Sequence, residues 1–329
     1  SQSGGFSPTP MQVAREDETN GGHPFSAREI VNRLLVADAR APDRAAAARL
    51  QDTMAPAEIQ AFLRDRTPDE IFALWGDSGF GMISTPDNFG DGHVLPDRDT
   101  AALFSDPARH NVVPVILGTN RDEPSLFMAQ DPQHTKRLLG LFPRLRDEAN
   151  YLRIVKYGAM AWKARGVDEL AEYMTSAGNP DVFAYRFDWD ELGSRGGFDL
   201  SKALGAAHFL EVPFVFGDFE NFPLAYLFEP SESRDLLSAQ MMSYWAQFAY
   251  TGDPGRGRDG TLPEWTAWGR NGQRSIVFDT AAGGGVRMIA DLVTRATVVE
   301  AIATDPDIPS QRERCALYLR TFRWGGQFD

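Results

Sequence analysis

Two residues of this sequence have the types and the surroundings that acid–base chemistry needs. Glu123 follows the short apolar, β-branched run that begins at Val113 and ends at Gly118. Such a run predicts a buried strand, and a carboxylate just past a strand is well placed for chemistry. Of the adjacent carboxylates Asp122 and Glu123, we expect only Glu123 to matter. The second residue, His208, lies in the small-residue segment GAAH, ahead of a segment rich in phenylalanine.

Each of these residues alone has an ordinary structural explanation. A charged residue after a strand is usually solvated, and one histidine is more often a satisfied structural residue than a base. Together they follow the chain order of the α/β-hydrolase triad, in which an acid precedes a histidine. In a triad the carboxylate fixes the imidazole tautomer and stabilises the imidazolium that forms when the ring takes a proton from serine. The pair therefore predicts a hydrolase and requires a nucleophile.

The nearest match in the chain to a Gly-x-Ser-x-Gly nucleophile motif is GDSGF, Gly76 to Phe80. Its Ser78 precedes Glu123 and His208, as the triad order requires. That motif needs a strand before the serine and a helix after it, whereas Ser78 follows a predicted helix and enters a loop-like stretch. We therefore expect the nucleophile to lie elsewhere, with Ser78 as the alternative.

The elements that must position the pair alternate between strands and helices, which favours an α/β architecture with helices packed on a sheet. Strands are predicted at Asp181 to Trp189 and Ser275 to Asp279. Helices are predicted by their apolar spacing and caps: Glu148 to Trp162, Asp235 to Tyr250, further helices from Ile289 onward, and Arg312 to Phe322.

The residues before the central strand are predicted to be largely helical. Ser26 and Glu29 form a capping-box pattern, and Thr67, Pro68 and Glu70 form a second helix start. Between these starts, Asp43 to Leu50 and Glu58 to Leu63 have helical patterns, and Gly76 to Asp99 is predicted to be an irregular loop. We expect the helical insertions to form a cap or outer layer and not a separate domain.

Charge and composition exclude several classes of function. A net charge of −13 and a pI near 4.9 disfavour nucleic acid and anionic membranes as partners. No apolar run is long enough to predict a membrane span, and the start SQSGGFSPTP has no targeting pattern, so the compartment is not predicted. Cys315 is the only cysteine, and no two histidines have helical ligand spacing, so we expect no metal and no cofactor.

Four segments resemble motifs of the type-B carboxylesterase, or cholinesterase-like, family. GTNRDEPSLF (118–127) and GAAHFLEVPFVFG (205–217) resemble its acid and histidine motifs. FGDGHVLP (89–96) is similar to its Asp-Gly turn, and WAQFAYTGDPG (245–255) is similar to a helix-ending signature. The resemblance spans nearly the whole chain. It implies an α/β-hydrolase fold, with this chain as the C-terminal portion of a mixed, mostly parallel sheet flanked by helices with helical insertions.

The resemblance also implies roles for single residues. Glu123 matches the triad acid, His208 matches the triad base, and Ser3 matches a serine that hydrogen-bonds the acid. The family's nucleophile and oxyanion loop lie upstream of the position of Ser1. Residues 1–329 are thus expected to be the C-terminal part of one catalytic domain, completed by an upstream segment or chain that carries the serine. Pro124 replaces the usual glycine after the acid and favours an extended conformation for Glu123.

The substrate is predicted from three positions of the same resemblance. Leu126 and Phe127 match residues that line the family's active-site gorge, although core packing is an equal alternative. Leu200 replaces the tryptophan with which cholinesterases bind quaternary ammonium, so the aromatic cage is incomplete. We therefore expect a small neutral, moderately apolar ester and a carboxylesterase that is inactive without its upstream segment. The alternative is a cholinesterase-like binding or adhesion module without catalysis.

Overall fold

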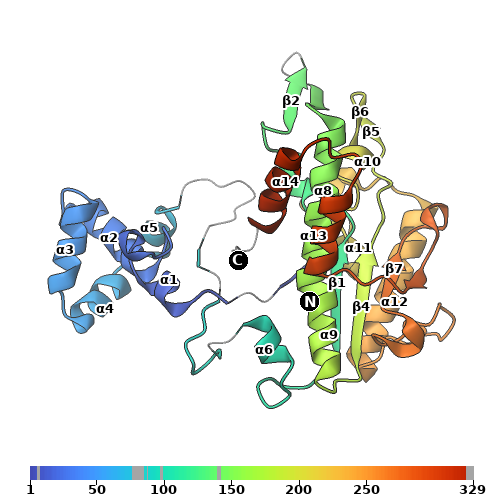
Figure 1. Cartoon of the computed structure of the whole chain (residues 1–329), viewed down its shortest axis with the longest axis horizontal. Coiled ribbons are helices and arrows are strands. Elements are labelled where there is room, and N and C mark those ends of the chain that lie inside the picture. The colour runs from blue at the N-terminus through green and yellow to red at the C-terminus, as the bar shows by residue number, and fades with distance from the viewer. Residues whose placement is uncertain (6–7, 76–84, 87, 97–98, 139–141, 324–329) are drawn as a thin grey trace. The chain divides into compact units, whose positions relative to one another are not determined.

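The computed structural model describes residues 1–5, 8–75, 85–86, 88–96, 99–138 and 142–323 (Figure 1). The chain forms two compact units, one of residues Ser7–Leu103 and one of residues Ser1–Phe6 with Phe104–Asp329. Glu123 and His208 both belong to the second, larger unit. In the part of the chain that the structure describes, no helix combines the length and apolar character needed to cross a bilayer.

The larger unit is built on a four-stranded sheet whose central strands are parallel. The strand order is β1 (Val115–Asn120), β4 (Val182–Phe187), β7 (Ser275–Phe278) and β8 (Arg287–Ile289). The pairs β1–β4 and β4–β7 are parallel, and β8 is antiparallel to β7. Parallel strands end at the same edge of a sheet, so the segments that follow β1 and β4 emerge together. The predicted mixed, mostly parallel sheet is confirmed.

The opening residues lie along the outer edge of β1. Gln2 forms a parallel bridge with Gly118. The backbone N–H of Ser3 donates to the carbonyl of Gly118 at 2.8 Å, and the N–H of Gly118 donates to the carbonyl of Ser1 at 2.9 Å. The first residues are therefore strand-like.

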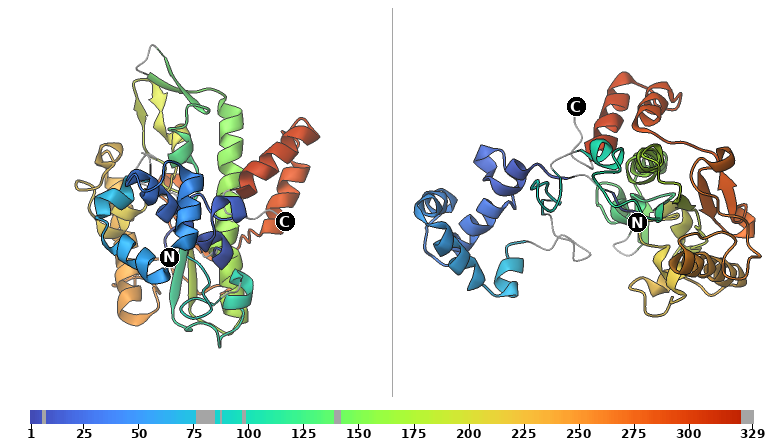
Figure 2. Two further views of the ribbon diagram at one scale, coloured as in Figure 1. Left: turned by 90° about the vertical axis from the view of Figure 1, so that its left-hand side faces the viewer. Right: turned by 90° about the horizontal axis from the view of Figure 1, so that it is seen from below.

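Helices cover both faces of this sheet because alternate residues of each strand point to opposite sides. Phe183, Tyr185 and Phe187 of β4 pack in a core cluster with α11 (Val212–Phe216) and α12 (Glu232–Thr251). Val182 and Ala184 pack on the other face against α9 (Glu169–Ser176). On that face α8 (Glu148–Lys163) continues through the π-helix η2 (Ala164–Asp168) into α9, and the three run along the sheet (Figures 1 and 2).

The remaining elements of the larger unit are short or lie outside the sheet. Helices α13 (Arg295–Thr304) and α14 (Gln311–Arg323) pack with α8 in a second apolar cluster. The others are β2 (Thr135–Leu138), β3 (Phe142–Leu145), β5 (Ser194–Arg195), β6 (Phe198–Asp199), α7 (Ser125–Met128), α10 (Leu200–Ala203), η3 (Ala225–Leu227), η4 (Arg270–Gly272) and η5 (Ala281–Gly283).

Most of the predicted elements of this unit are confirmed, with two differences. Helices were expected from Ile289 onward, but Ile289 ends strand β8 and the next helix begins only at Arg295. The physical reason is the cap, since the Thr294 hydroxyl accepts from the N–H of Thr297 and fixes the helix start. The β2–β3 hairpin was not predicted, because the sequence around Lys136 and Arg144 lacks an alternating apolar pattern.

The smaller unit is helical and has its own apolar core. Residues of α2, including Leu34 and Leu35, pack with Ala47 and Phe62 from the two following helices. The prediction that residues 1–329 belong to one catalytic domain is not tested by this division and stays a prediction. The elements of this unit are α1 (Met11–Arg15), η1 (Glu18–Asn20), α2 (Ala27–Ala37), α3 (Arg44–Thr53), α4 (Pro56–Arg64) and α5 (Pro68–Phe72), while α6 (Thr100–Phe104) spans the division.

The two predicted capping boxes of this unit differ in outcome. At Thr67 the box closes, because Glu70 and Thr67 each accept a hydrogen bond from the other's backbone N–H. At Ser26 only the first half forms, with the hydroxyl accepting from the N–H of Glu29. The carboxylate of Glu29 bonds Arg44 and the N–H of Glu18 instead, so the box does not close.

Candidate active site

Glu123 and His208, which the sequence separates widely, are in direct contact. Glu123 lies in the turn between β1 and α7, and its side chain is fully buried. Its Oε2 is 2.6 Å from Nδ1 of the half-buried His208. Its Oε1 accepts from the Thr119 hydroxyl at 2.9 Å and from the backbone N–H of Asn120 at 2.7 Å. The structure therefore brings together the two residues that the sequence singled out as acid and base.

The carboxylate also determines how the histidine titrates. Burial of the ring lowers the pKa of His208, but the hydrogen bond to Glu123 and the negative charges of Glu123 and Glu211 outweigh burial and raise it above its usual value. A carboxylate at Nδ1 keeps a proton on that nitrogen and leaves Nε2 available as an acceptor. The ring is thus arranged to take a proton at Nε2.

Asp122 connects the turn that contains Glu123 (the acid turn) to the loop that contains His208 (the histidine loop) by hydrogen bonds. Its backbone N–H donates to the carbonyl of Ala206 at 3.0 Å, and its Oδ2 accepts from the N–H of Ala206 at 2.9 Å. Gly205 has a φ of +54°, and a Cβ there would overlap the Asp122 carboxylate. That only Glu123 takes part in the chemistry stays a prediction: Glu123 contacts the histidine, and Asp122 holds the loop that carries it.

Asn120 and Glu211 extend the site, and neither was predicted from the sequence. The Asn120 side-chain Nδ2 donates to the carbonyl of Ala207 at 2.7 Å and to Oε2 of Glu211 at 2.6 Å. Glu211 is 2% exposed. Its burial, with the nearby charge of Glu123, raises the pKa of Glu211 to about 7. The sequence signal for Glu211 was its position inside the apolar run FLEVPFVF. A glutamate is seldom fully buried unless it has a partner.

Ser3 does not make the hydrogen bond to the acid that the resemblance implies. Its hydroxyl is buried and has no hydrogen-bond partner among the described residues. Its backbone is held elsewhere, with a φ of +52° and a carbonyl that accepts from Nε1 of Trp162 at 3.1 Å. The hydroxyl that bonds the Glu123 carboxylate belongs instead to Thr119, on the adjoining strand.

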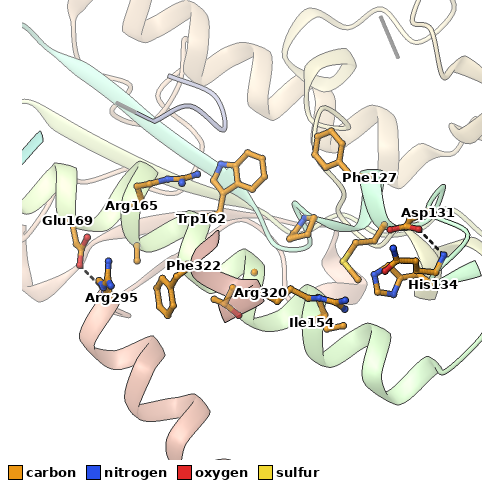
Figure 3. Close-up of a pocket in the computed structure, with 17 residues that line it drawn as sticks. Phe127, Asp131, His134, Ile154, Trp162, Arg165, Glu169, Arg295, Arg320 and Phe322 are labelled. Atoms are coloured by element: carbon orange, nitrogen blue, oxygen red, sulfur yellow. Dashed lines mark hydrogen bonds between the residues drawn. The ribbon is translucent and has the colours of Figure 1, made fainter. Parts of the chain in front are cut away.

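Two aromatic rings flank His208. The ring centroids of Phe127 and Trp162 lie 5.5 and 5.2 Å from the imidazole. Both rings also line a pocket of about 190 Å³, whose wall includes the arginines Arg165 and Arg320 (Figure 3). Of the two predicted substrate-pocket residues, Phe127 lines this pocket, whereas Leu126 is buried in the core cluster with β4.

The described residues place no serine nucleophile beside this pair. Among the described residues, no serine hydroxyl is hydrogen-bonded to His208. Ser78, the alternative nucleophile, lies outside the described residues. The described residues thus place an acid beside a histidine.

An acid after one strand of a parallel sheet and a histidine loop after the next strand are the arrangement of an α/β-hydrolase. Residues 143–283 match the sequence profile of the carboxylesterase family. The para-nitrobenzyl esterase of Bacillus subtilis is 25% identical over 208 residues, which cover 58% of this chain and 38% of the esterase. The acetylcholinesterase of Gallus gallus is 32% identical over 159 residues, which cover 45% of this chain and 19% of that enzyme.

These similarities agree with the motifs: the chain is similar to proteins of the type-B carboxylesterase family and has an α/β-hydrolase fold. A carboxylesterase structure from Geobacillus stearothermophilus is also similar, with a TM-score of 0.49 and 24% identity. That similarity covers 96% of this chain and 57% of the other chain. The chain therefore matches no more than about half of the length of these relatives.

Proposed function

We propose that this chain forms part of a serine carboxylesterase and provides its acid, Glu123, and its base, His208. The observation that supports this proposal is the 2.6 Å contact between Oε2 of Glu123 and Nδ1 of His208. A buried carboxylate in this position orients the imidazole and stabilises its protonated form, which is the role of the acid in a triad.

The proposed reaction uses His208 twice. The serine oxygen attacks the ester carbonyl carbon while Nε2 takes the serine proton, and the alcohol then leaves with that proton as the acyl-enzyme forms. Water attacks the acyl-enzyme in the same way, with Nε2 taking its proton and returning it to the serine. Glu123 keeps its negative charge throughout and holds the proton on Nδ1 in place.

The proposal assigns the serine and the oxyanion hole to an upstream segment, as in the family that the motifs resemble. The setting of Ser78, after the helical pattern of residues 67–75, supports this assignment over a nucleophile within residues 1–329. The chain alone is therefore expected to be inactive towards esters.

The proposed substrate is a small neutral, moderately apolar ester. The rings of Phe127 and Trp162 beside His208 offer apolar contact without a charge. Leu200, which stands in the position of the cholinesterase tryptophan, packs against the core and offers no aromatic face to a quaternary ammonium group.

The test compares hydrolysis of a short-chain nitrophenyl ester by residues 1–329 alone and by the chain joined to an upstream segment with a nucleophile motif. We expect activity only in the joined form. There, Glu123→Gln and His208→Ala should each lower kcat by several orders of magnitude, as removal of triad members does. Glu220→Gln, a change at an exposed carboxylate, is the matched control and should keep full activity.

Three outcomes would contradict this proposal. Full activity of the His208→Ala variant would remove the histidine from the mechanism. If residues 1–329 alone are active and the Ser78→Ala variant is not, Ser78 would be the nucleophile. An upstream segment without a nucleophile serine would favour the binding or adhesion module.

A further inference from the structure

We propose that Glu211 is a positioning residue of the Glu123–His208 pair: it is buried and joined to Glu123 through Asn120, and its ionisation around neutral pH strengthens the binding of a proton to His208. The inference deepens the proposed function and rests on it for its relevance to catalysis. The electrostatic coupling between Glu123, His208 and Glu211 follows from the positions of these side chains alone.

The geometry places one asparagine between two buried carboxyl groups. The Asn120 backbone N–H donates to Oε1 of Glu123 at 2.7 Å, and its side-chain Nδ2 donates to Oε2 of Glu211 at 2.6 Å. Asn120 itself is 1% exposed. Because one residue bonds both carboxyl groups, the two lie close together, and the negative charge of Glu123 adds to the effect of burial in raising the pKa of Glu211.

The surroundings decide which of the two keeps a proton. Glu123 bonds a hydroxyl, a backbone N–H and the ring of His208, so its charge is well stabilised. Among the described residues, Glu211 has one donor from another residue, the side-chain amide of Asn120. Hydrogen bonds to a carboxylate favour its ionised form, and burial favours the neutral form. Glu211 therefore keeps its proton below about pH 7, the value to which burial raises its pKa, and loses it above that pH.

The groups that face Glu211 come from three elements. They are Glu123 from the turn after β1, His208 from the loop that leads into α11, and the phenol of Tyr185 from β4. Burial raises the pKa of Tyr185 well above its usual value, so this phenol stays neutral. The charge of Glu211 acts on His208 in the same direction as that of Glu123, by raising its pKa. Loss of the Glu211 proton thus makes His208 a stronger base.

The test is an NMR titration of the histidine rings in the full chain, which needs no esterase activity. The chain has five histidines, and the His208 signal is identified by its loss in His208→Gln. We expect Glu211→Gln, which keeps the side-chain volume and cannot ionise, to lower the pKa of His208 by about 0.5–1 unit. Glu220→Gln, at an exposed position, should leave it unchanged.

A second measurement uses the unaltered protein and so does not depend on whether a variant folds. The side-chain carboxyl carbon of Glu211 in the unaltered protein should titrate near pH 7, because burial raises its pKa to about that value. A midpoint near the ordinary glutamate value, or a His208 titration in folded Glu211→Gln that matches the unaltered protein, would overturn the inference. An inactive joined enzyme that keeps this coupling would count against the proposed function alone.

Discussion

Oε2 of Glu123 and Nδ1 of His208 lie 2.6 Å apart across 85 residues of sequence. Neither side chain lies within a strand or a helix: Glu123 sits in the turn after β1, and His208 sits in the turn between α10 and α11. Hydrogen bonds between the two turns keep the side chains together. Asp122 and Asn120 make these bonds with the backbone of Ala206 and Ala207. The first prediction concerns these bonds.

Replacement of Asp122 by alanine should loosen the histidine loop and lower stability. The change leaves the N–H of the fully buried Ala206 without its acceptor and removes a salt-bridge partner of Arg121. Loss of an acceptor to a buried donor costs about 1–3 kcal/mol. Urea unfolding should show this decrease, while Asp259→Ala, at an exposed position, should change stability little. Equal stability of the two variants would mean that Asp122 does not hold the loop.

The acid turn and the histidine loop could be found from the sequence, but the bonds between them could not. Glu123 and His208 each lie in a motif that is recognisable locally. Glu123 follows an apolar strand pattern, and His208 follows a run of small residues. The partner of Asp122 is a backbone N–H, and any residue type can supply one. No sequence pattern therefore indicates that contact.

A similar limit explains the error at Ser3. The resemblance assigns a hydrogen bond to a position in sequence, but a hydroxyl bonds only where its backbone aims it. Ser3 adopts a left-handed φ of +52° and its hydroxyl has no partner among the described residues, while Thr119 meets the carboxylate. Strands and long helices were predicted better, because their apolar period extends over many residues and a single deviation does not remove it.

A second prediction concerns the packing of the two central strands. A Cβ at Gly118 of β1 would overlap the ring of Tyr185, which is fully buried on the neighbouring strand β4. Overpacking of a core of this kind costs about 1–3 kcal/mol. Gly118→Ala should therefore lower the midpoint of urea unfolding. Gly5→Ala is the matched control, since a Cβ there meets only Arg165 Nε at 3.7 Å. If the two variants unfold alike, the strands are not packed so closely.

A third prediction is that stability falls as pH rises through neutrality. The pKa of Glu211 is raised by burial to about 7, so its neutral form favours the folded state. That contribution is complete below the unfolded pKa near 4.5 and is lost as pH rises through about 7. The raised pKa of His208 acts in the same sense, with stability lost as pH rises above the unfolded value near 6.5.

Unfolding by urea at pH 5 and at pH 8 separates these contributions. Glu211→Gln should reduce the stability difference between the two pH values by roughly 3 kcal/mol, from a pKa difference of about 2.5 units. His208 still titrates in this variant, so a smaller difference of the same sign should remain. A pH dependence that is unchanged in Glu211→Gln would show that Glu211 ionises normally in the folded protein.

A fourth prediction concerns the hydroxyl that the sequence did not identify. Thr119 is 1% exposed and its Oγ1 donates to Oε1 of Glu123 at 2.9 Å. Thr119→Val keeps the shape of the side chain and removes the donor, so the buried carboxylate loses one of its stabilising bonds. A hydrogen bond to a charged group contributes about 1.5–3 kcal/mol, and the free energy of unfolding at pH 7 should fall by that amount.

Thr119→Ser is the matched control, because it keeps the hydroxyl and removes only a methyl group. It should recover most of the stability that the valine variant loses. The valine variant should also have a higher pKa of His208, since a carboxylate with one donor fewer is a stronger acceptor for the imidazolium. The serine variant should keep the unaltered value. A serine variant that loses as much stability as the valine variant would assign Thr119 to core packing, because the methyl group and not the hydroxyl would then be the part that matters.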